Sequence, residues 1–165
     1  MERILYTRRS IREFSSKEVS DDLILKIIDA GVQAPSAKNQ QPWEFIVVND
    51  KNLLKKISEN GSPLYAKCDK AIILCFKNYD LKTPHMVIQD MSACCENMLL
   101  MATSLGVGSC WIGTYPHEDR KENLRKCLNI PANLEPFCAI VLGYPVQSDA
   151  FRMVERQAKI HYNGF

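Results

Sequence analysis

The chain has 165 residues, 46% of them hydrophobic, which fits one globular domain built around a single core. Its 21 basic and 19 acidic residues give a formal charge of +2, too even for a general binder of nucleic acid. No apolar stretch approaches the roughly 18 to 20 residues that span a bilayer, and the opening MERILYTRRSIREF is charged where a signal peptide would be apolar. We therefore expect a cytoplasmic protein with neither a membrane nor a nucleic acid as partner.

The first half of the chain alternates amphipathic helices with apolar strands. Apolar residues recur at helical spacing over 20–34, behind Ser20 as the expected N-cap. The segment 43–50 is rich in aromatic and β-branched residues and predicts a strand, and 51–60 predicts a short helix. Residues 71–76, AIILCF, lack polar alternation, which is typical of a central strand covered on both faces.

The second half continues the alternation and ends in a polar tail. The segment 86–105 predicts a helix that is apolar around most of its circumference, and such a helix is buried in a core or a subunit interface. A strand over 108–113, a helix over 117–130 and a last core strand over 135–145 follow. The tail 146–165 has too weak a pattern to join a core, so we expect it to dock on a partner. The alternation favours a mixed sheet with helices on both faces.

The cysteines and histidines give no support to a metal site. The seven cysteines are an odd number without a CxxC pair, so zinc and disulfide frameworks are both disfavoured. Most lie among apolar neighbours, where a thiol behaves as a small hydrophobe. Cys94 and Cys95 are adjacent on the predicted helix and point in different directions, which disfavours a reactive pair. The three histidines have no acidic or cysteine partner at a ligand spacing.

A basic cluster lies near the amino terminus, in TRRSIREF. Arg8, Arg9 and Arg12 surround the hydroxyl of Ser10. Forked guanidinium donors beside a short neutral donor suit a phosphate monoester. Two other interpretations stay open: a solvated basic stretch near a frayed terminus, or a nucleic-acid contact, which the lack of a second basic patch weakens.

A second polar cluster, APSAKNQQPWEF, precedes the strand that Trp43 opens. Pro35 and Pro42 enclose amide and hydroxyl side chains, among them Ser36 and Asn39. Because prolines stiffen such a loop, its donors and acceptors could read the polar edge of a planar heterocycle. An ordinary surface turn has the same composition, so this segment alone leaves both interpretations open.

A third cluster, GVGSCWIGTYP, brings three glycines around an apolar pair. Gly106, Gly108 and Gly113 are spaced around Trp111 and Ile112. Glycine lets a backbone approach a flat ligand closely, and a backbone N–H aimed at a ring nitrogen stabilises negative charge there. The alternative is a helix C-cap followed by a core strand. The spacing is not the GxGxxG pattern of dinucleotide-binding folds.

Four segments in this order, RRSIREF, APSAKNQQPW, GVGSCWIG and LGYP, resemble the FMN-dependent nitroreductase family. The resemblance runs over nearly the whole chain and ends in KIHYNGF. It implies an α+β fold of three α-β-α layers, with a mixed central sheet flanked by helices. It also implies an obligate homodimer with FMN at the subunit interface.

The resemblance assigns cofactor-binding roles to three groups and one tail residue. The FMN phosphate and ring edge are matched to Arg8, Arg9, Ser10 and Arg12. Lys159 near the carboxy terminus is the implied second phosphate partner. The loop that the opposite subunit lays against the flavin is matched by Pro35, Ser36 and Asn39. The isoalloxazine is matched to the backbone of Trp111, Ile112 and Gly113, with the Gly113 N–H as the donor to flavin N5.

The activity that the resemblance implies is reduction of a flat electron acceptor at the expense of NADH or NADPH. Nitroaromatics, quinones and flavins are the expected acceptors, in a ping-pong cycle that needs no side-chain acid or base. The connection 81–90 is shorter than in many relatives, so the acceptor stays open. Alternatives are a relative specialised for flavins or halogenated aromatics, and an FMN-binding sensory or non-catalytic dimeric module.

Overall fold

The computed structural model describes residues 2–165. The helices are α1 (Glu2–Thr7), α2 (Asp21–Val32), α3 (Lys51–Glu59), α4 (Val87–Ser104) and α5 (Glu118–Leu128), with short 3-10 turns η1 (Ala37–Asn39) and η2 (Pro84–Met86). The strands are β1 (Trp43–Val48), β2 (Lys70–Lys77), β3 (Gly108–Gly113) and β4 (Leu134–Gly143). The predicted helices and strands are confirmed to within a few residues at their ends, and α1 is an addition to them.

The four strands form one sheet in the order β1-β2-β4-β3, and each neighbouring pair is antiparallel. The α+β class is confirmed, but the expectation of a mixed sheet is wrong for these strands. The parallel pairing recorded within residues 2–165 is an isolated bridge between Ser10 and Ser109. Hydrophobic patterns identify strands without giving their direction, and an α-helix between two strands does not by itself make them parallel.

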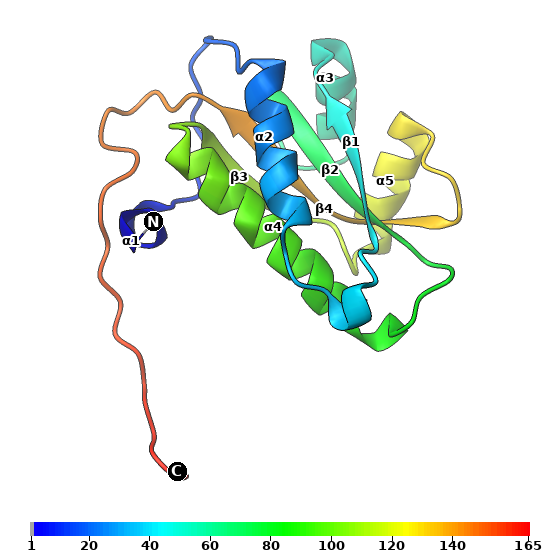
Figure 1. The fold of residues 1–165 in the computed structure, drawn as a ribbon. Helices are drawn as coiled ribbons and strands as arrows, with labels where there is room; N and C mark the ends of the chain where they lie inside the picture. Colours follow the sequence, from blue (N-terminus) through cyan, green and yellow to red (C-terminus); the bar gives the residue numbers. More distant parts are fainter. Residues whose placement is uncertain (1) are drawn as a thin grey trace.

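Helices cover both faces of the sheet, so the three expected layers are confirmed. Figure 1 shows α2 and α4 in front of the sheet and α3 and α5 behind it. Alternate residues of β2 point to opposite faces. Ile72 and Leu74 therefore pack with Met98 of α4, whereas Ile73 packs with Leu124 of α5. The strand is buried on both faces, as its unbroken apolar run predicts.

Two helix ends show how local sequence sets the boundaries. The Asp50 side chain accepts hydrogen bonds from the backbone N–H groups of Asn52 and Leu53 and so caps α3. Asn129 closes α5 in the left-handed conformation, with φ of 53°. Ser20 is the N-cap of α2 by backbone position, as expected, although its hydroxyl makes no capping hydrogen bond.

The two ends of the chain lie beside each other before they part. The tail after β4 contains neither helix nor strand, and Figure 1 shows it passing α1 and running away from the sheet. The N–H of Val154 donates to the carbonyl of Tyr6 at 3.3 Å, which is where the tail touches α1. Within residues 2–165 no helix is both long and apolar enough to cross a bilayer.

Candidate functional site

The segment that follows α1 lies along the outer edge of β3. The Ile11 N–H donates to the carbonyl of Ser109 at 2.9 Å, and the Ser15 N–H donates to the carbonyl of Tyr144 at 2.8 Å. Phe14 adds a bridge to Pro145 beyond the end of β4. The basic cluster predicted from the sequence is therefore attached to the sheet by backbone pairing. Its position relative to β3 is set by the fold.

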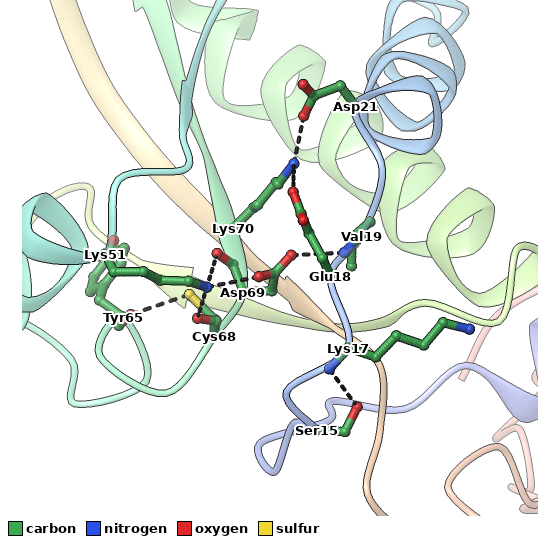
Figure 2. Close-up of polar contacts among 10 residues, drawn as sticks. All are labelled: Ser15, Lys17, Glu18, Val19, Asp21, Lys51, Tyr65, Cys68, Asp69 and Lys70. Carbon is green, nitrogen blue, oxygen red and sulfur yellow. Dashed lines mark hydrogen bonds and ion pairs between the residues drawn. The ribbon is translucent and has the colours of Figure 1, made fainter.

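A polar network centred on the buried residues Asp69 and Lys70 joins the continuation of this segment to the start of β2 (Figure 2). The Asp69 carboxylate accepts from the Val19 N–H at 2.8 Å, and the Lys51 ammonium donates to the same carboxylate at 2.7 Å. Lys70 is almost fully buried, and its ammonium donates to Asp21 at 2.5 Å. Because buried charges without partners are costly, these contacts give the segment a defined path from β3 to α2.

The outer edge of β3 presents backbone groups that β4 does not use. In an antiparallel pair, N–H and C=O groups of successive residues point alternately toward and away from the neighbouring strand. The Ser109 carbonyl points away from β4, since it accepts from Ile11. Trp111 and Gly113 share this orientation by alternation. The Arg120 guanidinium donates to the Gly113 carbonyl at 2.8 Å, which confirms that this carbonyl points away from β4.

Nothing in the fold itself requires Gly113 to be a glycine. Its φ is not in the left-handed region, and a Cβ built on it would meet no atom within 4 Å. By contrast, a Cβ on Gly108 would lie 2.9 Å from Ile11, and one on Gly143 would lie 2.7 Å from Phe14. The open space beside Gly113 is the kind that a close-lying ligand needs.

A hollow of about 580 Å³ follows this edge of β3, within the usual range of small-molecule sites. It is lined by Arg12, by the loop 60–64, by the strand residues 110–113, and by Asp119 and Arg120 at the start of α5. The structure thus brings the N-terminal cluster and the β3 cluster together. The sequence did not indicate that the loop 60–64 and Arg120 line this hollow, because their composition is that of an ordinary turn and an ordinary helix.

Several positive charges gather where the N-terminal segment meets the tail. Arg8 forms a half-exposed ion pair with Glu96 of α4 at 3.2 Å. The pKa of Arg9 is lowered by desolvation and by the charges of Arg156, Arg8 and Arg152. A group of positive charges such as this one attracts an anion. The sequence did not indicate that Arg152 and Arg156 lie near Arg9, since the tail shows no pattern of its own.

The remaining predicted residues lie elsewhere in the single chain. Lys159 is exposed on the extended tail and makes no hydrogen bond or ion pair with the rest of residues 2–165. Pro35, Ser36 and Asn39 belong to the loop between α2 and β1. No hydrogen bond within the described chain joins this loop to β3 or to the N-terminal segment. One chain therefore assembles two of the three predicted groups.

The loop between α2 and β1 has an unusual backbone. Lys38, Asn39 and Gln41 have φ of 50°, 51° and 45°. A left-handed conformation costs a residue other than glycine about 1–3 kcal/mol, and such strain is concentrated at functional sites. Asp90 of α4 holds the loop, since its carboxylate accepts from the Ala37 N–H at 2.9 Å. Sequence reasoning missed Asp90, although an acidic residue within an apolar helix is a usable signal.

The cysteines are structural. All seven are free, and six of them are buried. Burial raises the pKa of Cys68, Cys75 and Cys94 to about 12 each, which suppresses the reactive thiolate. Their predicted behaviour as small hydrophobes is confirmed.

The α+β fold has three layers, and a cationic segment runs along an open strand edge. This arrangement suits a flat anionic ligand. Comparison with known proteins identifies the family more closely. The model of the nitroreductase family matches residues 5–62 and 64–144. An Archaeoglobus fulgidus protein, provisionally named NADH dehydrogenase/NAD(P)H nitroreductase, is 45% identical over 152 residues, which are 90% of this chain and 87% of that protein. The chain belongs to the nitroreductase family.

Solved structures agree with this assignment. A provisionally named NADH oxidase from Clostridium acetobutylicum superposes with a TM-score of 0.93 at 38% identity, covering 98% of this chain and 99% of that one. An FMN-dependent nitroreductase from Clostridium difficile superposes with a TM-score of 0.87 at 28% identity, covering 100% of both chains.

Proposed function

We propose that this chain is an FMN-dependent oxidoreductase that uses NADH or NADPH to reduce flat acceptors such as nitroaromatics, quinones or flavins. The observation that carries the proposal is the open backbone edge at Gly113, which faces a hollow also lined by Arg12. The FMN dependence of the Clostridium difficile relative supports the choice of cofactor. Free, unpaired thiols suit a reducing compartment, so we assign the protein to the cytoplasm.

The residues on this edge fit FMN, and each group has a role. The backbone of Trp111, Ile112 and Gly113 would hold the isoalloxazine ring, with the Gly113 N–H directed at N5. The phosphate and ring edge would be held by Arg8, Arg9, Ser10 and Arg12. Arg152 and Arg156 would add positive charge to the phosphate site, because they already lie near Arg9. Lys159 would join them if the tail folds toward the site in the assembled protein.

The protein is proposed to work as a homodimer in which each chain is one FMN-binding domain spanning 1–165. The loop with Pro35, Ser36 and Asn39 would then cover the flavin of the opposite subunit, which explains its separation from the hollow in one chain. The tail 146–165 would wrap on the partner. Its exposed apolar side chains support this, since they are costly in water: Met153, Ile160, Tyr162 and Phe165.

The chemistry supplied by bound FMN is two-electron transfer in a ping-pong cycle, from the nicotinamide to the flat acceptor. The chain's own part is to bind, orient and stabilise. The Gly113 N–H would stabilise negative charge that develops at the ring nitrogen, and the guanidinium groups of Arg12 and Arg120 would favour the electron-rich ring. No side chain needs to move a proton.

Anaerobic reduction tests the proposed function. We expect NADH or NADPH to bleach the visible absorption of the bound flavin, and a quinone to restore it. Initial rates with both substrates varied should give parallel double-reciprocal lines, since one substrate leaves before the other binds. A bound flavin that neither nicotinamide reduces would reject the enzyme in favour of a sensory or non-catalytic module.

A further inference from the structure

Asp90 is a buried carboxylate whose two oxygens both serve the loop between α2 and β1. It is 4% exposed, and no cationic side chain within residues 2–165 forms an ion pair with it. Its Oδ1 accepts from the Ala37 N–H at 2.9 Å, and its Oδ2 accepts from the Gln40 side-chain amide at 2.6 Å. Since a buried carboxylate is stable only with such donors, the loop and Asp90 depend on each other.

Gln40 extends this attachment to a second point of the chain. It is 7% exposed, and its amide nitrogen also donates to the Thr83 carbonyl at 3.2 Å. Its amide oxygen accepts from the Thr83 N–H at 3.0 Å. The loop is therefore tied to α4 and to the residues that precede it. These ties enclose Lys38 and Asn39, which hold the left-handed conformation.

We propose that Asp90 is a positioning residue of the cofactor site, which acts by holding this loop in the shape that meets the flavin. The inference rests on the proposed function, in which Ser36 and Asn39 contact FMN of the opposite subunit. Asp90 itself would not touch the cofactor. Without its two hydrogen bonds the loop would relax from its strained backbone, and FMN would bind only to the fraction of molecules in which the loop is correctly shaped.

The test compares two isosteric variants. Asp90→Asn keeps an oxygen that accepts from the Ala37 N–H, but it places an NH2 donor opposite the NH2 donor of the Gln40 side chain. Asp69→Asn is the matched control, because Asp69 is also a buried carboxylate that accepts a backbone N–H, from Val19 at 2.8 Å. This hydrogen bond lies beyond the proposed phosphate-binding residues 8–12, which the backbone hydrogen bond from Ile11 to Ser109 attaches to β3 without Asp69. Asp69 lies at the start of β2. The loop between α2 and β1 contacts the other end of this strand, where the Lys77 N–H donates to the Pro42 carbonyl.

Both variants should lower the thermal midpoint of the cofactor-free protein. Only Asp90→Asn should raise the FMN dissociation constant, by about ten-fold or more, whereas Asp69→Asn should stay within about two-fold of wild type. The double variant Asp90→Asn with Gln40→Glu restores an acceptor opposite the introduced amide, so it should recover part of the affinity. An unchanged FMN affinity in Asp90→Asn, or equal weakening in both single variants, would overturn the inference.

A second readout separates this inference from the proposed function. Hydrogen exchange of the Ala37 amide, measured without FMN, should speed up in Asp90→Asn and not in Asp69→Asn. If the wild-type protein takes up no FMN, the proposed function fails. The exchange rate then still decides whether Asp90 fixes the loop, and an unchanged rate would show that it does not.

Discussion

Replacing Gly113 with alanine separates the needs of the fold from the needs of the ligand. A Cβ at this position meets no atom within 4 Å, and its φ is one that alanine adopts. Alanine also reduces the freedom of the unfolded chain, which stabilises a protein by about 0.4–1 kcal/mol. The cofactor-free variant should therefore unfold at the wild-type temperature or up to about 4 °C above it.

FMN binding should respond in the opposite direction. The added methyl group occupies the space in which we propose that the ring lies, and it displaces the ring from the Gly113 N–H. A lost hydrogen bond costs about 0.5–1.5 kcal/mol, and lost contacts on the ring add to this. With a total of about 1.5–3 kcal/mol, the dissociation constant should rise about 10- to 100-fold.

Quenching of FMN fluorescence, titrated alongside thermal unfolding, measures both quantities. Gly108→Ala is the contrasting variant, because its Cβ would lie 2.9 Å from Ile11 and 3.0 Å from the Gly143 carbonyl. That variant should lose stability without any ligand present. If Gly113→Ala folds normally and binds FMN as tightly as wild type, the ring does not lie on this edge of β3 and the reasoning is refuted.

Further outcomes follow from the same structure. The double variant Arg8→Gln with Arg12→Gln should stay folded, because exposed ion pairs contribute at most about 1 kcal/mol to stability. Its FMN affinity should fall about 100-fold or more. Retained stoichiometric flavin would reject the assignment of these arginines to the phosphate. Hydrogen bonds to Glu118 of α5 and Glu135 of β4 raise the pKa of Lys121 above its ordinary value of 10.5. The ammonium group therefore contributes its full share of stability below pH 10.5, and this contribution is lost as the pH rises through the pKa of the folded state. Urea unfolding from pH 8 to 12 should show this loss, and Lys121→Met should reduce it. In the native protein one thiol, Cys127, should react quickly with a disulfide reagent, and all seven should react in urea.

Local pattern was enough to predict most elements of the fold. The helix over 20–34 and the central strand over 71–76 have periodicities that belong to one kind of structure each, and they correspond to α2 and β2. Strand direction was not predictable, because it depends on long-range pairings such as Ile72 with Ile140. The six-residue α1 was also missed, since so short a helix leaves little periodicity in a sequence.

The candidate site was predictable where a cluster is local and unpredictable where distant segments meet. Arg12 and Gly113 were identified within their own segments, and the structure brings them to one hollow. Arg120 joins them only through tertiary packing, so no spacing rule could have found it. Asp90 is hard to identify from the sequence because apolar residues dominate its helix, although its buried side chain accepts a hydrogen bond from the loop that precedes β1.

The absorption spectrum of the purified protein, dialysed after incubation with FMN, tests the central claim most directly. The account predicts retained visible flavin absorption equal to one FMN per chain. A colourless protein that keeps no flavin after dialysis, and that does not quench FMN fluorescence on titration, would contradict it.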